Sequence, residues 1–321
     1  MHCGPCARPV SRHPVPAIRR PLCAPNFGLV WTCTLVTAHQ AEAVVLRKWP
    51  VHEADEIVSL FTRSHGRIRG VAKAAAKSRR RFGGALEPMT WVTASYVERP
   101  KQDLVRLDAC EVLSSPLSDP VNYARAAALA FYAEVLEEAL PDHDPHEAVF
   151  RLVLAVLEQT RDMRIWMPVT YFSLWITRLL GWMPSLTHCT LCGEAFGAEA
   201  AWFEAWSDGL VCSRHKQGAS RALCAESLAL ARRIFQSPVA ALAAEDWPAN
   251  RAADLRRFTS QALERHLERK LHSAAALSKL GEGTGQSTPT RRTSVAMEVG
   301  ERVNVSRANS VEAMMCELNK K

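Results

Sequence analysis

Two short pairs of metal-ligating residues are the part of this sequence best suited to chemistry. The pairs are Cys189-x2-Cys192 and Cys212-x2-His215. Thiolate and imidazole groups at this knuckle-like spacing are the ligands that zinc takes in tetrahedral sites. Four protein ligands leave no open position for water, so we expect a structural Zn²⁺ within residues 189–215 rather than a catalytic one. Gly193 and Gly209 stand beside the pairs, where the chain needs sharp turns around a metal.

A run of basic residues between Arg63 and Leu86 indicates a second kind of site. It contains eight Lys and Arg residues and no carboxylate. Aromatic residues (Phe61, Phe82 and Trp91) are interleaved with it. Cations can follow a phosphate backbone while aromatic faces stack on bases of any identity, so we predict a nucleic-acid interface. The residues assigned to it are Lys48, Arg67, Arg69, Lys73, Lys77, Arg79, Arg80, Arg81 and Phe82.

Catalytic motifs are missing from the sequence. It has no P-loop, no G-x-S-x-G nucleophile elbow and no H-E-x-x-H zinc motif. A zinc deaminase needs H-x-E ahead of P-C-x-x-C, but the H-x-E match at 266–268 follows the first cysteine pair. We therefore predict a binding protein and not an enzyme. The net charge of +7 and a pI near 9.0 agree with a polyanionic partner.

The elements that position these residues change character along the chain. Between residues 42 and 113, short alternating segments are separated by turn residues, which is typical of a small barrel, and an OB-fold is the expected form. From Asp119-Pro120 onward, apolar residues recur at helical spacing instead. The expected strands are 43–46, 57–61, 67–71, 91–97 and 104–107. The expected helices lie around 129–140, 145–157, 171–180, 226–235 and 250–271.

The predicted fold class is therefore α+β and multidomain, with an N-terminal OB-fold barrel followed by an all-α domain that carries an inserted zinc knuckle. We expect residues 1–40 to be a leader, disordered or part of a misassigned start. The barrel covers 41–115, the helical domain covers 119–280, and residues 281–321 form a disordered tail. Ten unevenly spaced cysteines and the lack of an apolar stretch of about 18 residues indicate a cytoplasmic protein without a membrane contact.

The order of these parts closely resembles the RecO family of bacterial recombination mediators, over roughly residues 42–280. Val44-Val45-Leu46-Arg47, the segment 60–68, and Phe82-Gly83-Gly84-Ala85-Leu86 carry the resemblance in the first half. Leu179-Leu180-Gly181-Trp182-Met183-Pro184 and the cysteine pair followed by Gly193 carry it in the second. Two positions depart from the family pattern, because Ala74 stands where glycine is usual and His215 replaces a cysteine. Some family members lack the metal altogether.

The resemblance implies binding of single- and double-stranded DNA, annealing of complementary strands, and loading of the recombinase onto strands coated with single-strand-binding protein. It implies two protein partners, RecR and the acidic C-terminal tail of single-strand-binding protein, which docks on the helical domain. It also implies a nucleoid-associated, cytoplasmic location. Two alternatives stay open at this point: an OB-fold and zinc protein that acts on RNA, and a divergent zinc hydrolase or deaminase.

Overall fold

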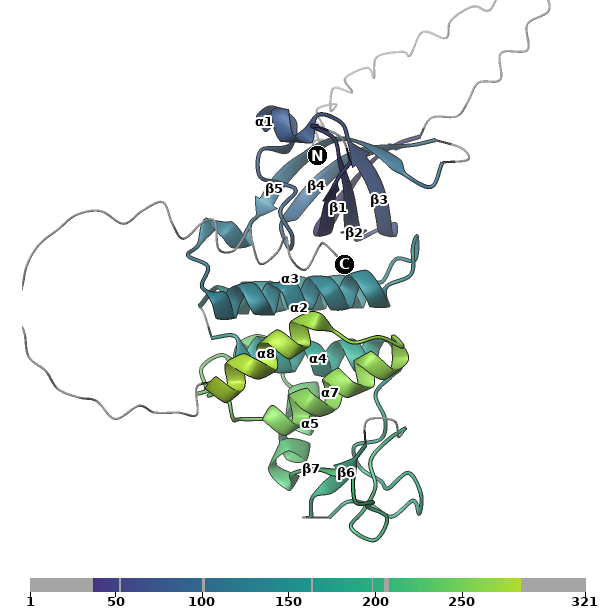
Figure 1. Cartoon of the computed structure of the whole chain (residues 1–321), viewed down its shortest axis with the longest axis vertical. Helices are drawn as coiled ribbons and strands as arrows, with labels where there is room; N and C mark the ends of the chain where they lie inside the picture. The colour runs from purple at the N-terminus through teal and green to yellow at the C-terminus, as the bar shows by residue number, and fades with distance from the viewer. Residues whose placement is uncertain are drawn as a thin grey trace, which may run out of the picture. The chain divides into compact units, whose positions relative to one another are not determined.

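The computed structural model describes residues 37–283 except 52, 100–101, 163, 198 and 205–207. In this part of the chain, strands come first and helices follow (Figure 1). The predicted leader and tail therefore lie almost entirely outside the described residues. The N-terminal elements are β1 (Thr37–Pro50), β2 (Glu56–Thr62), β3 (Gly66–Ala72), the 3-10 turn η1 (Ala75–Lys77), α1 (Arg79–Phe82), β4 (Trp91–Glu98), β5 (Val105–Ser114) and η2 (Pro116–Ser118).

Strand β1 closes these strands into a barrel because it pairs with two neighbours. Residues Thr37 to Val44 pair antiparallel with β4, and the part from Ala43 to Pro50 pairs with β2. The strand order is β1-β2-β3-β5-β4, with β3 and β5 parallel. The five strands expected from the sequence are all present, although β1 and β5 are longer than expected. The core inside the barrel consists of alternate strand residues and of Phe82, Ala85 and Leu86 from the segment between β3 and β4.

Helices make up most of the described residues after 119. They are α2 (Tyr123–Ala139), α3 (Glu147–Gln159), η3 (Thr160–Asp162), α4 (Trp166–Leu179), α5 (Ala225–Gln236), α6 (Val239–Leu242), α7 (Ala253–His266) and α8 (His272–Gly283). Between α4 and α5, the short strands β6 (Ala201–Phe203) and β7 (Arg221–Leu223) form a two-stranded sheet. Helix α8 and this small sheet were not expected from the sequence. No helix in the described part of the chain combines the length and apolar character needed to cross a membrane.

Glu134 of α2 holds the first turn of α8. Its carboxylate accepts hydrogen bonds from the backbone N–H groups of His272 and Ser273 at 2.9 and 2.8 Å. These groups are among the four unpaired donors that begin every helix, so an acidic side chain placed there satisfies two of them and complements the helix dipole. Helix α8 also buries Leu277 in the apolar core that contains α2, so this contact and apolar packing together hold the helix.

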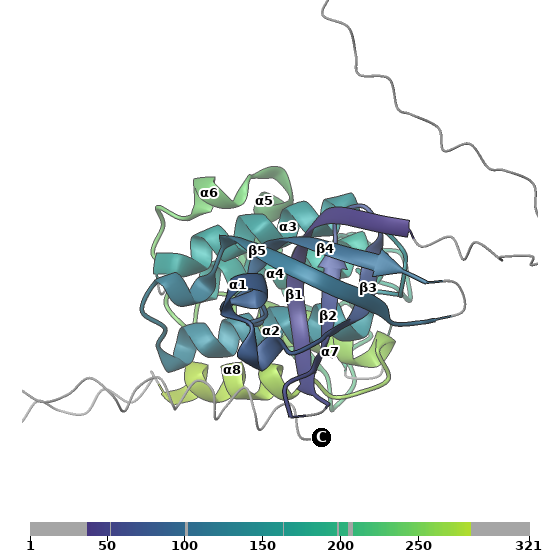
Figure 2. The same ribbon diagram turned by 90° about the horizontal axis from the view of Figure 1, so that it is seen from above.

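The outer face of the barrel packs on the helices. Phe61 on β2 meets Phe150 on α3 with ring centroids 5.6 Å apart, and Val44 and Leu46 of β1 belong to the same apolar core as α2 and α3. Figure 2 shows α2 and α3 beneath the strands. A buried polar contact accompanies this packing, since the Ser59 hydroxyl donates to the Glu137 carboxylate at 2.5 Å. Part of the barrel surface is thereby removed from solvent.

The loop between α2 and α3 covers the turn that joins β2 to β3. The backbone N–H of His143 donates to the carbonyl of Arg67 at 2.9 Å, and Asp142 forms a parallel bridge with the same residue. Gly66 in the turn has φ +68°, and a Cβ at this position would collide with the backbone of Asp144. Only glycine satisfies both the left-handed backbone and the close approach of the loop.

Replacing Gly66 with alanine is therefore expected to lower the free energy of unfolding by about 2–4 kcal/mol, from left-handed backbone strain plus displacement of the loop. Gly84→Ala is the matched control, because Gly84 has φ +86° but nothing lies within 4 Å of its added Cβ. Urea unfolding of both variants separates the two effects. Equal losses in the two variants would show that the loop contact contributes nothing.

Candidate functional site

The two predicted pairs of metal ligands meet at one point between α4 and α5. The ligand atoms of Cys189, Cys192, Cys212 and His215 all lie within 4.8 Å of one another. The Cys189 sulfur lies 3.6 Å from His215 Nδ1, the Cys212 sulfur lies 3.3 Å from the same nitrogen, and the Cys192 and Cys212 sulfurs are 3.9 Å apart. The structure thus brings together all four residues that the sequence singled out.

Tight turns aim these side chains at a common centre. The N–H of Gly193 donates to the carbonyl of Cys189 at 2.9 Å, and the N–H of His215 donates to the carbonyl of Cys212 at 3.0 Å. Gly193 has φ +71°, as a turn that folds back over its first cysteine requires. Gly209 has φ +128°, and a Cβ there would collide with the Thr190 hydroxyl. Both glycines singled out in the sequence therefore have a positive φ.

The cluster's electrostatics favour a cation. Burial opposes ionisation of the Cys189 thiol, but hydrogen bonds from backbone N–H groups, including those of Cys192 and Cys212, lower its pKa to about 6. Desolvation and the neighbouring sulfurs of Cys189 and Cys212 raise the pKa of Cys192 to about 11. Ionisation of the Cys189 thiol is thus favourable, while ionisation of a second thiol beside it, that of Cys192, is unfavourable. A bound divalent cation would remove that unfavourable effect.

Three of the six separations among the four ligand atoms fit a tetrahedral zinc ion, and none of the six exceeds 4.8 Å. Zinc–sulfur bonds of about 2.3 Å and zinc–nitrogen bonds of about 2.0–2.1 Å give sulfur–sulfur edges near 3.8 Å and sulfur–nitrogen edges near 3.6 Å. The separations of 3.9, 3.6 and 3.3 Å lie close to these values. Sulfur-rich donor sets of this kind suit zinc better than magnesium or calcium. The four residues could therefore hold zinc, with every position of the ion filled by protein.

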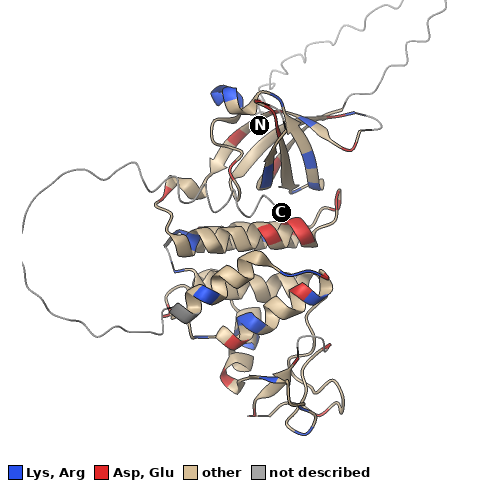
Figure 3. Ribbon diagram, in the orientation of Figure 1, with Lys and Arg blue, Asp and Glu red and all other residues tan. Residues whose placement is uncertain are grey.

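The predicted basic interface is divided by the structure into two groups. Lys73, Lys77, Arg79 and Arg80 are exposed and have no ion-pair partner among the described residues. They follow β3 through η1 and α1, and we call this group the basic turn. Figure 3 shows the cations of α1 apart from those of β3. Arg81 is half-buried, donates to the carbonyl of Lys73 at 2.6 Å, and lies over the Phe82 ring.

The remaining predicted cations each have a carboxylate within 4 Å. Lys48 lies 2.6 Å from Glu87. The Arg67 side chain is 11% exposed and lies 2.7 Å from Asp142, with Glu137 on its other side. Arg69 is more open, at 42% exposed, and lies 3.5 Å from Glu137. Arg67 therefore joins the barrel to the helices rather than presenting its charge to solvent.

The assignment of Phe82 as a base-stacking residue needs a correction. Its ring is 2% exposed and belongs to the core inside the barrel, so no base can reach its face. Phe61 is fully buried against α3. The physical reason is that α1 is a single short turn whose one apolar residue closes the end of the barrel. Only its charged residues point outward.

A polar cleft between the barrel and α2 includes two residues that were not assigned to a site from the sequence, Arg47 and Trp49. The cleft has a volume of about 480 Å³. Its lining residues are Arg47, Trp49, Ile57, Arg67, Arg69, Leu104, Glu137 and Glu138. The sequence did contain a signal for them: Arg47 and Trp49 are two residues apart at the end of an apolar strand, so their side chains are expected on the same face.

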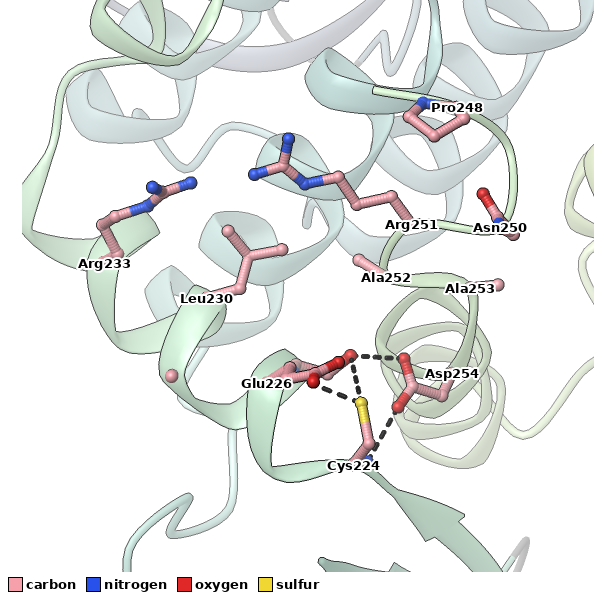
Figure 4. Close-up of a pocket in the computed structure, with 12 residues that line it drawn as sticks. Cys224, Glu226, Leu230, Arg233, Pro248, Asn250, Arg251, Ala252, Ala253 and Asp254 are labelled. Carbon is pink, nitrogen blue, oxygen red and sulfur yellow. Dashed lines mark hydrogen bonds between the residues drawn. The ribbon is translucent and has the colours of Figure 1, made fainter. Parts of the chain in front are cut away.

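A larger hollow of about 910 Å³ lies between α5 and the start of α7 (Figure 4). Its two arginines share one acid, since Arg233 and Arg251 lie 2.8 and 2.6 Å from Glu245. The Asp254 carboxylate accepts hydrogen bonds from the Ser227 hydroxyl at 2.5 Å and from the backbone N–H of Cys224 at 2.9 Å. Cys224 is the residue just before α5. No histidine lines this hollow to activate the Cys224 thiol, so the described residues there do not form a nucleophile–base pair.

Comparison with known proteins gives one consistent result. Residues 36–116 match the family model "Recombination protein O N terminal", and residues 120–275 match "Recombination protein O C terminal". A DNA repair protein RecO of Koribacter versatilis is 54% identical over 241 residues, which cover 75% of this chain and 98% of that protein. The RecO proteins of Anaeromyxobacter dehalogenans and Bifidobacterium adolescentis are 34% and 31% identical, over 74% of this chain and 95% and 98% of those proteins.

Proposed function

The chain belongs to the RecO family of DNA repair and recombination proteins, and from this premise we propose that it acts as a recombination mediator. In this role it binds single- and double-stranded DNA, anneals complementary strands, and helps to load the recombinase onto strands coated with single-strand-binding protein. Annealing makes and breaks no covalent bond. The prediction that the chain is not an enzyme is confirmed by the family to which it belongs.

The observation that carries this proposal is the basic turn on the barrel. Four exposed cations lie together on a short segment with no carboxylate paired to them among the described residues. Such a group contributes to affinity through the release of counterions from DNA, without regard to sequence. The strand order of the barrel and its closure by β1 support an OB-fold, a fold that often binds oligonucleotides. We therefore assign the OB-fold and place the DNA interface on it.

The cysteine and histidine cluster is proposed to hold a structural zinc ion. It would tie the chain between α4 and α5 into a fixed shape, since the regular elements among the described residues of this stretch are the two short strands β6 and β7. The proposed partners beyond DNA are RecR and the C-terminal tail of single-strand-binding protein, with the tail bound by the helical domain. The proposed location is the nucleoid within the cytoplasm.

A strand-annealing assay tests the proposal directly. Two complementary oligonucleotides are each coated with single-strand-binding protein and mixed with the chain, without any nucleotide. We expect duplex to form faster than in the same mixture without the chain, as a rise in energy transfer between dyes on the two strands. Non-complementary strands serve as the control. Acceleration on bare strands but not on coated ones would contradict the mediator function and leave only passive DNA binding.

A further inference from the structure

The outer face of β1, β2 and β3 is covered by helices at one end only. Antiparallel pairing sets Arg47 opposite Ser59 and Ser59 opposite Arg69, so these three side chains lie side by side on one face. Trp49 and Ile57 form the next pair on the same face. The helices cover this face around Phe61 and Ser59, where the contacts to Phe150 and Glu137 are made. Beyond Ser59 the face opens into the cleft of about 480 Å³ described above.

The groups that line the cleft are suited to a planar, anionic ligand. Trp49 is half-buried, with the Arg47 guanidinium 5.1 Å from its ring centroid. Arg69 lines the same cleft, and its side chain is 42% exposed although it lies 3.5 Å from Glu137. The cleft's volume falls in the range of about 300–1,000 Å³ that is usual for small-ligand sites.

The two carboxylates in the cleft do not oppose an anion as strongly as their number implies. Glu138 lies 2.6 Å from Arg269 and is neutralised by it. Burial raises the pKa of Glu137, against the opposing effect of hydrogen bonding to Ser59 and the charge of Arg67. Glu137 also lies 3.5 Å from both Arg67 and Arg69, so each carboxylate of the lining is paired with an arginine.

We propose that this cleft holds one unpaired nucleotide of single-stranded DNA, with its base against the Trp49 ring and its phosphate at Arg69 and Arg47. A duplex keeps its bases stacked inside and cannot offer one to Trp49, whereas a single strand can. The basic turn, in contrast, binds the phosphates of single-stranded and of duplex DNA alike. The inference rests on the proposed DNA-binding function and adds that two separate surfaces distinguish single strands from duplex.

Variants of Trp49 test the proposal. Affinities for a dye-labelled oligo(dT) strand and for a duplex of equal length are measured by fluorescence anisotropy. Trp49→Leu keeps an apolar side chain but removes the aromatic face, and it is expected to weaken single-strand binding roughly 5- to 100-fold. Trp49→Phe keeps an aromatic face and should stay within about threefold of the original chain. Duplex affinity should stay within about twofold for both variants.

The matched control is Tyr123→Leu, which removes an aromatic ring that is 56% exposed at the start of α2 and lies outside the cleft. It should leave both affinities unchanged. Thermal unfolding of each variant checks that the fold is intact. Equal losses for single strands and duplex in Trp49→Leu, or no loss for either, would overturn the cleft assignment. A chain that binds no DNA in any form would instead overturn the proposed function itself.

Discussion

Replacing Arg79 and Arg80 together with glutamine is expected to weaken binding to single-stranded DNA roughly tenfold at 0.15 M salt and to flatten its salt dependence. Both side chains are exposed and unpaired among the described residues, so their charges are available to phosphates. Each lost phosphate contact should reduce the slope of log affinity against log salt by about 0.7, or by about 1.4 for the pair. Titrations at four or more salt concentrations measure this slope.

Adding Arg81→Gln to this variant should have a smaller further effect on the slope. The Arg81 guanidinium donates to the carbonyl of Lys73 and to the Ser78 hydroxyl, so it is already engaged within the protein. Its loss should lower stability more than DNA affinity.

The control for the double variant is Arg151→Gln with Arg257→Gln, two exposed arginines of α3 and α7. This pair removes the same net charge at a distance from the basic turn in the sequence. Equal slopes for the two double variants would show that only net charge matters and that the basic turn is not the DNA site.

Substituting Cys192 with serine is expected to reduce the zinc content from about one equivalent to below about a tenth, and to release the segment between α4 and α5 from its fixed shape. Structural zinc contributes folding free energy outright, and it would join the two hydrogen-bonded turns around Cys189 and Cys212, whose neighbours Leu210 and Val211 pack into the main core. Elemental analysis of the purified protein measures the first effect. Limited proteolysis, with cleavage sites mapped by mass spectrometry, measures the second.

Cys224→Ser is the matched control for this experiment. Cys224 is exposed and lies outside the cluster, and its side chain accepts from the N–H of Ser227 at the start of α5. Serine performs the same capping role at a helix start, so zinc content and protease resistance should not change. Purified chain that contains no zinc before any substitution would contradict the metal assignment.

The features that depend on short spacing were predictable from the sequence. Pairs such as Cys189-x2-Cys192 are close in the chain and share a turn, so their residue types and spacing predict that their ligand atoms converge. Alternation of apolar and polar residues located the strands, and the turn residues separated them. The order of the motifs predicted the family, which the comparisons show.

The parts that depend on packing could not be predicted in the same way. The predicted cations from Arg67 to Arg81 follow one another in the sequence, but they lie in different surroundings. Arg67 on β3 contacts the helical half of the chain, whereas Arg79 and Arg80 on α1 are exposed to solvent. Nothing local to Arg67 predicts Asp142 as its partner. The burial of Phe82 depends on where α1 meets the barrel. The place of Trp49 on the open face depends on a register shift between Val45 and Arg47, which changes the side of the strand that follows.

The contact between Glu134 and the start of α8 has a consequence for the newborn protein on the ribosome. The two ends of this contact are 138 residues apart in the sequence. At a synthesis rate of about 5–20 residues per second, the second end follows the first by roughly 7–28 s. During that time the barrel can close, but the face of α2 that meets α8 has no cover. Nascent chains stalled before residue 272 should therefore recruit chaperones that bind apolar helices, and chains stalled well after α8 has emerged should not.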